Sequence, residues 1–287
     1  MQKIVQQFQL SYTAISDVQD SHSSTVYKIT LLHGEEVYLK IPYTKVKFER
    51  ELEAYQLLQN RVATPKLIDY WQGDETCPGA FLLSSLKGAP LSVNTATPRT
   101  AYEVGKLHAS LHEVIFTEQM EVHAIQNEFE NWPDFIGRQF YSFAEDVQKV
   151  LTKQTVEQAI AQFERMKQGL PMPEGPSFVH MDFRPANIIV DGESVSGVID
   201  FESVRFGATE VDFTKLKRDF LRFDAKLDAA YQEGYNSLRP LIDLNNVLPF
   251  YRFADAFNSI GWCVRRGIEK NQRFYEENHR LLHQLLR

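Results

Sequence analysis

The amino-acid sequence predicts an α+β fold of two lobes, a small antiparallel sheet with one helix followed by a mainly helical lobe. Two strand-like runs meet at a hairpin signal near the N-terminus, and amphipathic helices occupy most of the chain after residue 98. A turn-like segment at 87–90 separates the two regions. The 287 residues are enough for two such cores. We therefore place the lobes at 1–85 and 86–287.

The first lobe is expected to begin its sheet with strands at 26–32 and 36–41, joined by a turn that contains glycine. In the second strand the apolar side chains share one face and Lys40 lies on the other, because strand side chains alternate. Apolar residues at helical spacing predict a helix over 45–59. A short apolar run at 81–83 is a buried strand and completes the lobe.

The second lobe is expected to be mainly helical. An apolar stripe predicts a helix over 98–114, and residues 140–168 also have a helical pattern. Prolines at both ends of 171–176 indicate a turn. The remaining elements are short β segments and further helices: 177–190, 195–201 and, broken near Pro240 and Pro249, 212–287.

Composition and charge exclude several classes of protein. Only Cys77 and Cys263 occur, which rules out a disulfide framework or a cysteine zinc site and favours a cytoplasmic protein. No apolar run reaches the ~20 residues of a membrane span, and the N-terminus has no signal-peptide pattern. The net charge of −7 argues against a nucleic-acid partner. Residues 113–148, with eight acids and one arginine, account for that whole excess.

Polar residues that suit phosphoryl transfer follow two apolar runs in the second lobe. Asp182 and Asn187 lie five residues apart in a loop, and Asp200 directly follows Val198-Ile199. Two carboxylates and one carboxamide at adjacent strand ends are able to hold a hard cation such as Mg²⁺ through oxygen. In phosphoryl transfer one carboxylate must also orient the hydroxyl that is phosphorylated. We assign that catalytic role to Asp182 and the metal to Asn187 and Asp200.

The order of these residues resembles the aminoglycoside phosphotransferase and choline kinase family. The resemblance rests on His180-x-Asp182-x-x-x-x-Asn187 and on Ile-Asp-Phe-Glu at 199–202. It implies a two-lobed protein-kinase-like fold, with Asp212 bracing the catalytic loop. Met181 and Glu202 stand where protein kinases carry arginine and glycine, which favours the small-molecule branch over a protein kinase.

The same resemblance implies nucleotide-binding residues in the first lobe. Lys40 lies on the strand whose lysine contacts the nucleotide phosphates. Glu51 lies on the helix whose glutamate pairs with that lysine, and it falls within the apolar stripe. The other candidates lie in the nucleotide loop, which contains no glycine to ease a close approach to phosphates, and in the adenine-binding hinge: Ser23 and Ser24, and Ser84, Ser85 and Leu86.

Several candidates have two interpretations. Arg184 either contacts the γ-phosphate in the catalytic site, since guanidinium suits phosphate geometry, or pairs with a carboxylate and holds the loop. Glu202 is a metal neighbour or a structural brace. Acidic residues within 113–148 either attract a cationic acceptor, with neighbouring aromatics stacking on it, or form a solvated face. The candidates for acceptor binding are Glu128, Glu130 and Asp134.

These observations together predict a kinase that uses ATP and Mg²⁺ to phosphorylate a hydroxyl of a small molecule. The acceptor is expected to be an aminoglycoside-like compound, an amino alcohol or a sugar metabolite. The alternative is a catalytically weak or inactive protein of the same fold that binds a nucleotide or a partner, and the glycine-free loop is its only support. We expect neither nucleic acid nor membrane as a partner. Fold alone gives neither the acceptor nor the choice between ATP and GTP.

Overall fold

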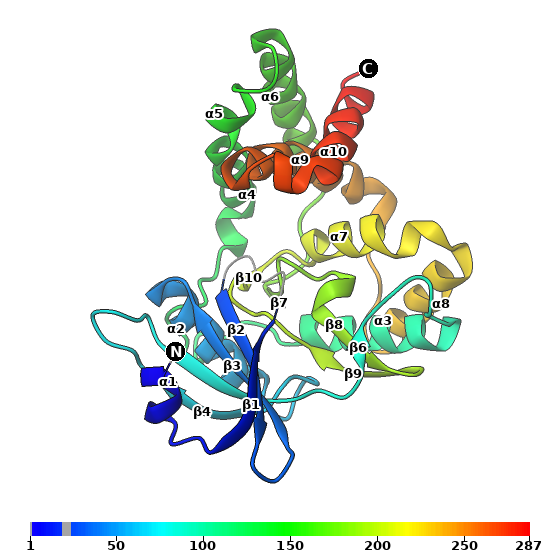
Figure 1. Cartoon of the computed structure of the whole chain (residues 1–287). Helices are drawn as coiled ribbons and strands as arrows, with labels where there is room; N and C mark the ends of the chain where they lie inside the picture. The colour runs from blue at the N-terminus through cyan, green and yellow to red at the C-terminus, as the bar shows by residue number, and fades with distance from the viewer. Residues whose placement is uncertain (1, 19–23) are drawn as a thin grey trace.

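The computed structural model of the chain describes residues 2–18 and 24–287 and has the two-lobed architecture that the sequence predicts. Figure 1 shows the first lobe as a twisted sheet with α2 beside it, and the second lobe as helices around short strands. None of the helices in the described residues is both long and apolar enough to span a membrane. The predicted lobe boundary lies between β5 (Ala80–Ser84) and β6 (Ala89–Pro90).

The first lobe is built on a five-stranded antiparallel sheet in the order β1-β2-β3-β5-β4. The predicted hairpin and the helix are present with ends shifted by one or two residues, and the sequence analysis did not identify α1, β1 or β4. The elements besides β5 are α1 (Gln2–Gln7), β1 (Tyr12–Asp17), β2 (Ser24–Leu31), β3 (Glu36–Pro42), α2 (Lys45–Leu58) and β4 (Leu67–Trp71).

Alternation in β3 sends its side chains into two different environments. Val37 and Leu39 are buried between the sheet and α1, while Lys40 lies on the opposite face, toward α2. Helix α2 begins at its N-cap Thr44 and packs Phe48 against Phe81 of β5, with ring centroids 4.7 Å apart. The sheet therefore has apolar residues on one face and presents a lysine to the other lobe.

The second lobe surrounds two small sheets with helices. A three-stranded sheet pairs β6, β8 and β9, and a two-stranded sheet pairs β7 with β10. The long helix α9 begins at Leu244, after the predicted break at Pro240. The elements are α3 (Pro98–His112), α4 (Trp132–Ser142), α5 (Ala144–Val147), α6 (Lys153–Gln168), β7 (Ser177–Val179), β8 (Ile188–Asp191), β9 (Ser194–Val198), β10 (Arg205–Gly207), α7 (Asp212–Asp219), α8 (Ala225–Asn236), α9 (Leu244–Arg266) and α10 (Gln272–Leu285).

Two sequence predictions about this lobe were wrong. The helix expected over 140–168 is three helices, because the chain turns after Ser142 and α6 starts afresh at its N-cap Thr152. Pro249 lies inside α9 and does not break it. A proline removes one helical hydrogen bond, and the buried residues that follow, Phe250 and Tyr251 among them, hold the helix in the core.

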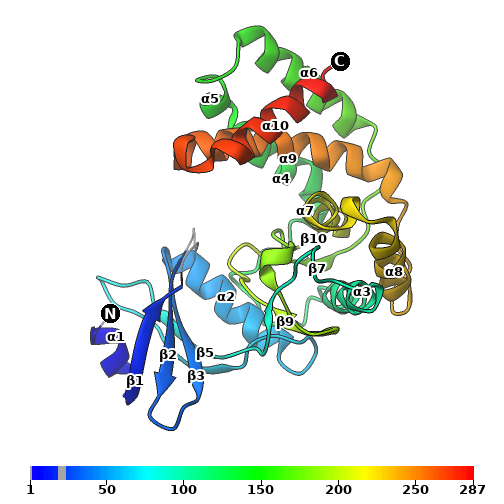
Figure 2. The same ribbon diagram turned by 45° about the vertical axis from the view of Figure 1, so that its right-hand side comes forward.

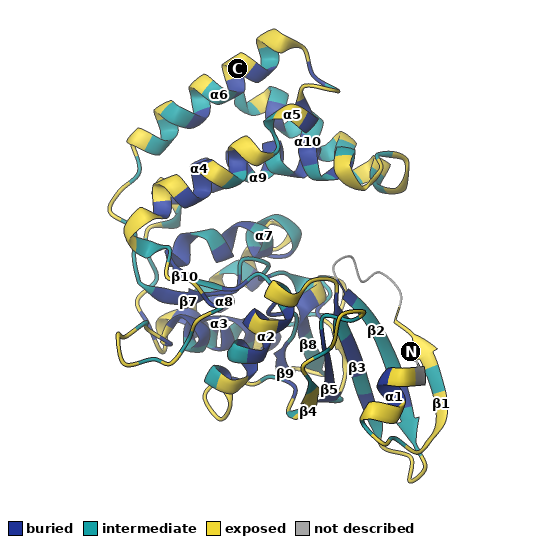
Figure 3. Cartoon of the chain, turned by 90° about the vertical axis from the view of Figure 1, so that its left-hand side faces the viewer, coloured by how far each residue is buried: buried dark blue, intermediate teal, exposed yellow. Residues whose placement is uncertain are grey.

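The helices of the second lobe form two groups. Helices α3 and α8 pack beside the small sheets, whereas α4, α5, α6, α9 and α10 gather at the opposite end, as Figures 1 and 2 show. The second group has its own core, with Phe140 stacked on Phe163 and Phe257 at 3.9 and 4.1 Å. Figure 3 shows the exposed residues of α4 and α6 on the faces turned away from that core. The arrangement leaves the segment after β7 between the two groups.

The contact of α3 with α8 depends on glycines. A Cβ at Gly105 would lie 2.1 Å from the Tyr231 carbonyl oxygen, and one at Gly234 would lie 2.0 Å from that of Tyr102.

Gly105→Ala should therefore force the helices apart and lower the free energy of unfolding, measured by urea denaturation, by about 1–3 kcal/mol. Gly137→Ala in α4 is the matched control, because its nearest atom is 3.9 Å away. It should instead gain up to about 1 kcal/mol, and equal effects of the two would contradict the packing argument.

Candidate active site

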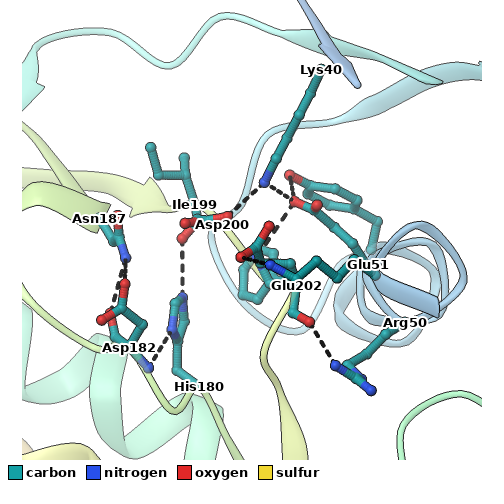
Figure 4. Close-up of polar contacts among 12 residues, drawn as sticks. Lys40, Arg50, Glu51, His180, Asp182, Asn187, Ile199, Asp200 and Glu202 are labelled. Atoms are coloured by element: carbon teal, nitrogen blue, oxygen red, sulfur yellow. Dashed lines mark hydrogen bonds and ion pairs between the residues drawn. The ribbon is translucent and has the colours of Figure 1, made fainter. Parts of the chain in front are cut away.

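Lys40 is the centre of a buried charge cluster that joins the lobes. Its Nζ lies 2.7 Å from Glu51 Oε1 in α2 and 2.6 Å from Asp200 Oδ1 in the second lobe (Figure 4). Burial raises the pKa of Glu51 to about 6, with Lys40 opposing it. Burial would lower the pKa of Lys40, but Asp200 and Glu51 outweigh it and hold that pKa above its ordinary value. The predicted ion pair is thus present, and the lysine stays charged.

A second set of contacts ties α2 to residues 201–202. Glu51 Oε1 accepts the Phe201 N–H at 3.4 Å, and Arg50 donates to the Glu202 carbonyl oxygen at 2.9 Å. The Glu202 side chain is buried and pairs with Lys47 of α2 at 2.9 Å. These contacts match the interpretation of Glu202 as a structural brace. They fix the backbone around Asp200 against the first lobe.

The loop after β7 is held by a buried carboxylate. Asp212, at the start of α7, accepts the His180 N–H at 2.5 Å and the Met181 N–H at 2.7 Å, which confirms its predicted bracing role. Burial would raise the pKa of Asp212, but the imidazoles of His108 and His112, with Nε2 atoms 3.8 and 3.4 Å from its Oδ2, keep that pKa well below the ordinary value. Those two histidines also contact tyrosine hydroxyls of α8, so the loop is anchored to the helical core.

Asp182 lies in that loop with both carboxylate oxygens engaged. Oδ1 is 2.6 Å from Lys215 Nζ, and Oδ2 is 3.0 Å from Asn187 Nδ2 and 3.3 Å from Arg184 Nε. Burial alone would raise the pKa of Asp182, but the positive charges of Lys215 and Arg184 bring it below the ordinary value. The carboxylate is therefore ionised at neutral pH, in the state that accepts a proton or orients a hydroxyl.

Lys215 was missed by the sequence analysis. It lies in α7, 33 residues after Asp182, and also donates to the Met181 carbonyl oxygen at 3.2 Å. No short motif links the two positions, so only the docking of α7 on the loop brings them together. Arg184 contacts Asp182, as one of its two interpretations requires. It also lines the cleft between the lobes that is described below, where the other interpretation places a phosphate.

Asn187 and Asp200 offer oxygen ligands from neighbouring segments. The Ile199 N–H donates to the Asn187 carbonyl oxygen at 2.9 Å. This bond holds the backbone at Asn187 beside the residue that precedes Asp200. Asn187 Nδ2 is committed to Asp182, so its side-chain oxygen is the atom left for a metal. A carboxylate and an amide oxygen are a suitable donor pair for Mg²⁺. The backbone at Asp200 has φ +74°, a conformation that non-glycine residues keep chiefly where the surroundings demand it.

A cleft of about 1210 Å³ runs between the lobes and contains these groups. Ser84 and Leu86 line one end, and the Ser84 hydroxyl already accepts the Lys66 N–H at 2.9 Å. Ser85 is not among the lining residues, and its hydroxyl contacts the Leu86 carbonyl oxygen at 3.4 Å. Ser24 also lines the cleft, while Ser23 lies outside the described residues. The other end is walled by α4, α7, α9 and α10.

The predicted acceptor acids do not join this cleft. Glu128 pairs with Arg138 at 2.8 Å, Glu130 is exposed, and Asp134 lines a separate cavity of about 460 Å³. Of the aromatic residues between them, Trp132 and Phe135 are buried in the helical core. The amphipathic pattern of α4 explains the placement of Asp134, because the apolar face of this helix packs inward and Asp134 is exposed on the other face.

Solved structures of phosphotransferases share this fold. They include a thermostable mutant of the aminoglycoside phosphotransferase APH(4)-Ia in complex with AMP-PNP and hygromycin B, with a TM-score of 0.72, 14% identity and coverage of 99% of this chain and 97% of that one. They also include the spectinomycin phosphotransferase APH(9)-Ia with ADP and spectinomycin, with a TM-score of 0.68, 11% identity and 96% and 93% coverage. The macrolide 2′-phosphotransferase MphH from Brachybacterium faecium gives 0.65, 15% identity and 96% and 94% coverage. At these identities the likeness shows the fold alone.

Comparison of the sequence itself places the chain in a family. No curated protein matches it significantly. The model of the phosphotransferase enzyme family (APH) matches residues 14–246, which include both β3 and the loop that carries Asp182. The chain therefore belongs to the phosphotransferase enzyme family, which confirms the resemblance stated from the motifs and the prediction of a small-molecule kinase.

Proposed function

We propose that the protein transfers the γ-phosphoryl group of ATP to a hydroxyl of a small molecule, with Mg²⁺ bound at Asn187 and Asp200. The observation that carries the proposal is the meeting of two charge clusters in one cleft, Lys40 with Glu51 and Asp200, and Asp182 with Asn187. Phosphoryl transfer depends on positioning and on stabilising charge, and these clusters supply both.

The residues at the two ends of the cleft have different roles, one set binding the nucleotide and the other activating the acceptor. Lys40, held by Glu51, presents its ammonium to the phosphates, and the hinge at Ser84–Leu86 contacts the adenine. Asp182 accepts the proton of the acceptor hydroxyl as its oxygen forms a bond to the γ-phosphorus. The bond from that phosphorus to the β–γ bridging oxygen breaks, and ADP leaves. Bound Mg²⁺ would neutralise charge on the phosphates.

Two measurements test the proposal against the alternative of an inactive nucleotide-binding protein. A thermal-shift assay with ATP and Mg²⁺ checks nucleotide binding, and ADP release with a panel of hydroxyl compounds checks transfer. Both are expected to be positive. Binding without transfer to any acceptor would favour the inactive alternative, and absence of binding would contradict both.

Asp182→Asn should abolish transfer because the amide accepts no proton. We expect kcat to fall by about 10³-fold or more while the Kd for ATP stays within about twofold. Asp69→Asn, at an exposed aspartate of β4, is the control and should keep normal kcat. A variant that retains a tenth of the normal turnover would exclude Asp182 as the base.

Asp200→Asn should weaken the metal site, because a neutral amide binds Mg²⁺ less well than a carboxylate. The Mg²⁺ concentration for half-maximal rate should rise by about tenfold or more, and most activity should be lost. Magnesium titration at saturating ATP measures this. An unchanged magnesium dependence would show that Asp200 does not hold the metal.

Lys215→Met should alter the pH dependence of transfer. Lys215 lowers the pKa of Asp182, so its removal should raise that pKa and move the acidic limb of the kcat profile to higher pH. Lys217→Met is the matched control, because Lys217 lies on the same helix and forms a 2.6 Å ion pair with Asp228 instead. If both variants keep the wild-type profile, Lys215 does not act on Asp182.

A further inference from the structure

The acceptor end of the cleft is basic. Apart from the nucleotide and metal residues, its walls on the second lobe carry more bases than acids. All three acids already have a cationic partner: Asp182 pairs with Lys215 at 2.6 Å, Asp255 with Arg218 at 2.5 Å and Glu202 with Lys47 at 2.9 Å. Each of these carboxylates is therefore already neutralised by a cation of the protein itself. The charged residues of these walls are Arg184, Arg205, Lys215 and Arg218, with Asp182, Glu202 and Asp255.

Arg205 of β10 is the wall residue with the least compensation. Within the described part of the chain it has no carboxylate within ion-pair distance, and its Nη1 donates only to the carbonyl oxygens of Ser203 and Val204, at 3.1 and 2.6 Å. Its Nε is buried and has no hydrogen-bond partner. A buried, unpartnered N–H of a guanidinium is costly unless a ligand satisfies it.

Arg50 adds to the positive charge at this place. It also lines the cleft, and its guanidinium donates only to the carbonyl oxygens of Glu202 and Ala124, at 2.9 and 3.4 Å. Burial and the charge of Arg50 lower the pKa of Arg205 to about 10, so it remains protonated at neutral pH. Acids oppose the lowering of the pKa values of these two arginines, Glu128 for Arg205 and chiefly Glu202 for Arg50. Glu128 and Glu202 already form ion pairs with other residues, Glu128 with Arg138 and Glu202 with Lys47.

We propose that Arg205, with Arg50 beside it, binds an anionic group of the acceptor, which is then an alcohol that carries a carboxylate or a phosphate. The inference rests on the proposed function and names its substrate class. Arg205 pairs across the sheet with Val179, only three residues before Asp182. Three residues span at most about 10 Å and paired strands lie about 5 Å apart, so the backbones at Asp182 and Arg205 are within about 15 Å of each other. Both residues line the same cleft, so we expect one small molecule to bridge them.

The test compares acceptors that share a skeleton and differ in charge. Glycerol, glycerate, glycerol phosphate and 3-amino-1,2-propanediol form one set, and glucose, glucuronate, glucose 6-phosphate and glucosamine form another. We expect the anionic members to have the highest kcat/KM, and the carboxylate and phosphate members distinguish the two anions. A preference for the cationic or neutral member would overturn the inference while leaving the kinase proposal intact.

Arg205→Gln should then raise the KM of the best anionic acceptor by about 10- to 100-fold and change the KM for ATP by less than about twofold. Arg205→Lys, which keeps the charge, should recover part of the loss. Arg99→Gln, at an exposed arginine of α3 paired with Glu103, is the surface control and should match the wild type. An increase confined to the KM for ATP would assign Arg205 to the nucleotide and contradict the inference.

A binding measurement decides the question without turnover. Calorimetric titration of inorganic sulfate into the protein saturated with AMP-PNP and Mg²⁺ should detect an anion site beyond the filled nucleotide site. That binding should disappear in Arg205→Gln and persist in Arg99→Gln. No sulfate binding to the wild type, or equal binding to both variants, would overturn the inference. Failure of AMP-PNP itself to bind would contradict the proposed function instead.

Discussion

The ammonium of Lys40 is the point on which the two lobes depend. Two carboxylates contact it, Glu51 from the same lobe and Asp200 from the other, and the lysine and Glu51 are almost completely buried. Removing the partner of a buried charge costs far more free energy of folding than an ion pair on the surface contributes. The lobes are therefore coupled electrostatically at the place where the nucleotide phosphates are proposed to bind, and any movement of α2 also moves the surroundings of Asp200.

A second buried charge, that of Asp212, holds the loop after β7 in place, as Lys40 holds the two lobes together. It orders two successive backbone N–H groups and is itself surrounded by His108 and His112, which burial keeps neutral. The loop thus has a polar anchor inside an aromatic core, where His108 stacks on Phe183 at 3.9 Å. A rigid loop limits the directions in which the Asp182 side chain can point. Such a restriction suits the role that we propose for Asp182, because a general base must approach the acceptor hydroxyl in one geometry.

Local sequence signals were sufficient for the parts of the site that lie within one motif or one element. The alternation of β3 placed Lys40, the stripe of α2 placed Glu51, and the spacing from His180 to Asn187 identified the loop. Lys215 and Arg205 carry no such signal, because their contacts arise from the docking of α7 and from the pairing of β10 with β7. The extent of α9 through Pro249 likewise depended on core packing that no local pattern encodes.

The acidic stretch shows why net charge along the sequence is a poor guide to charge in a site. Residues 113–148 carry the whole excess of the chain, yet α4 turns Ile136 and Gln139 toward the cleft and leaves Asp134 outside it. Long-range attraction from those acids is screened within about 8–10 Å of exposed charge. Charged groups in the cleft wall contact a bound molecule directly and in a less polar medium. Their electrostatic interaction with the acceptor is therefore stronger than that of the acids outside the cleft. The basic wall around Arg205, and not the acidic stretch, is therefore the basis for the acceptor that we propose.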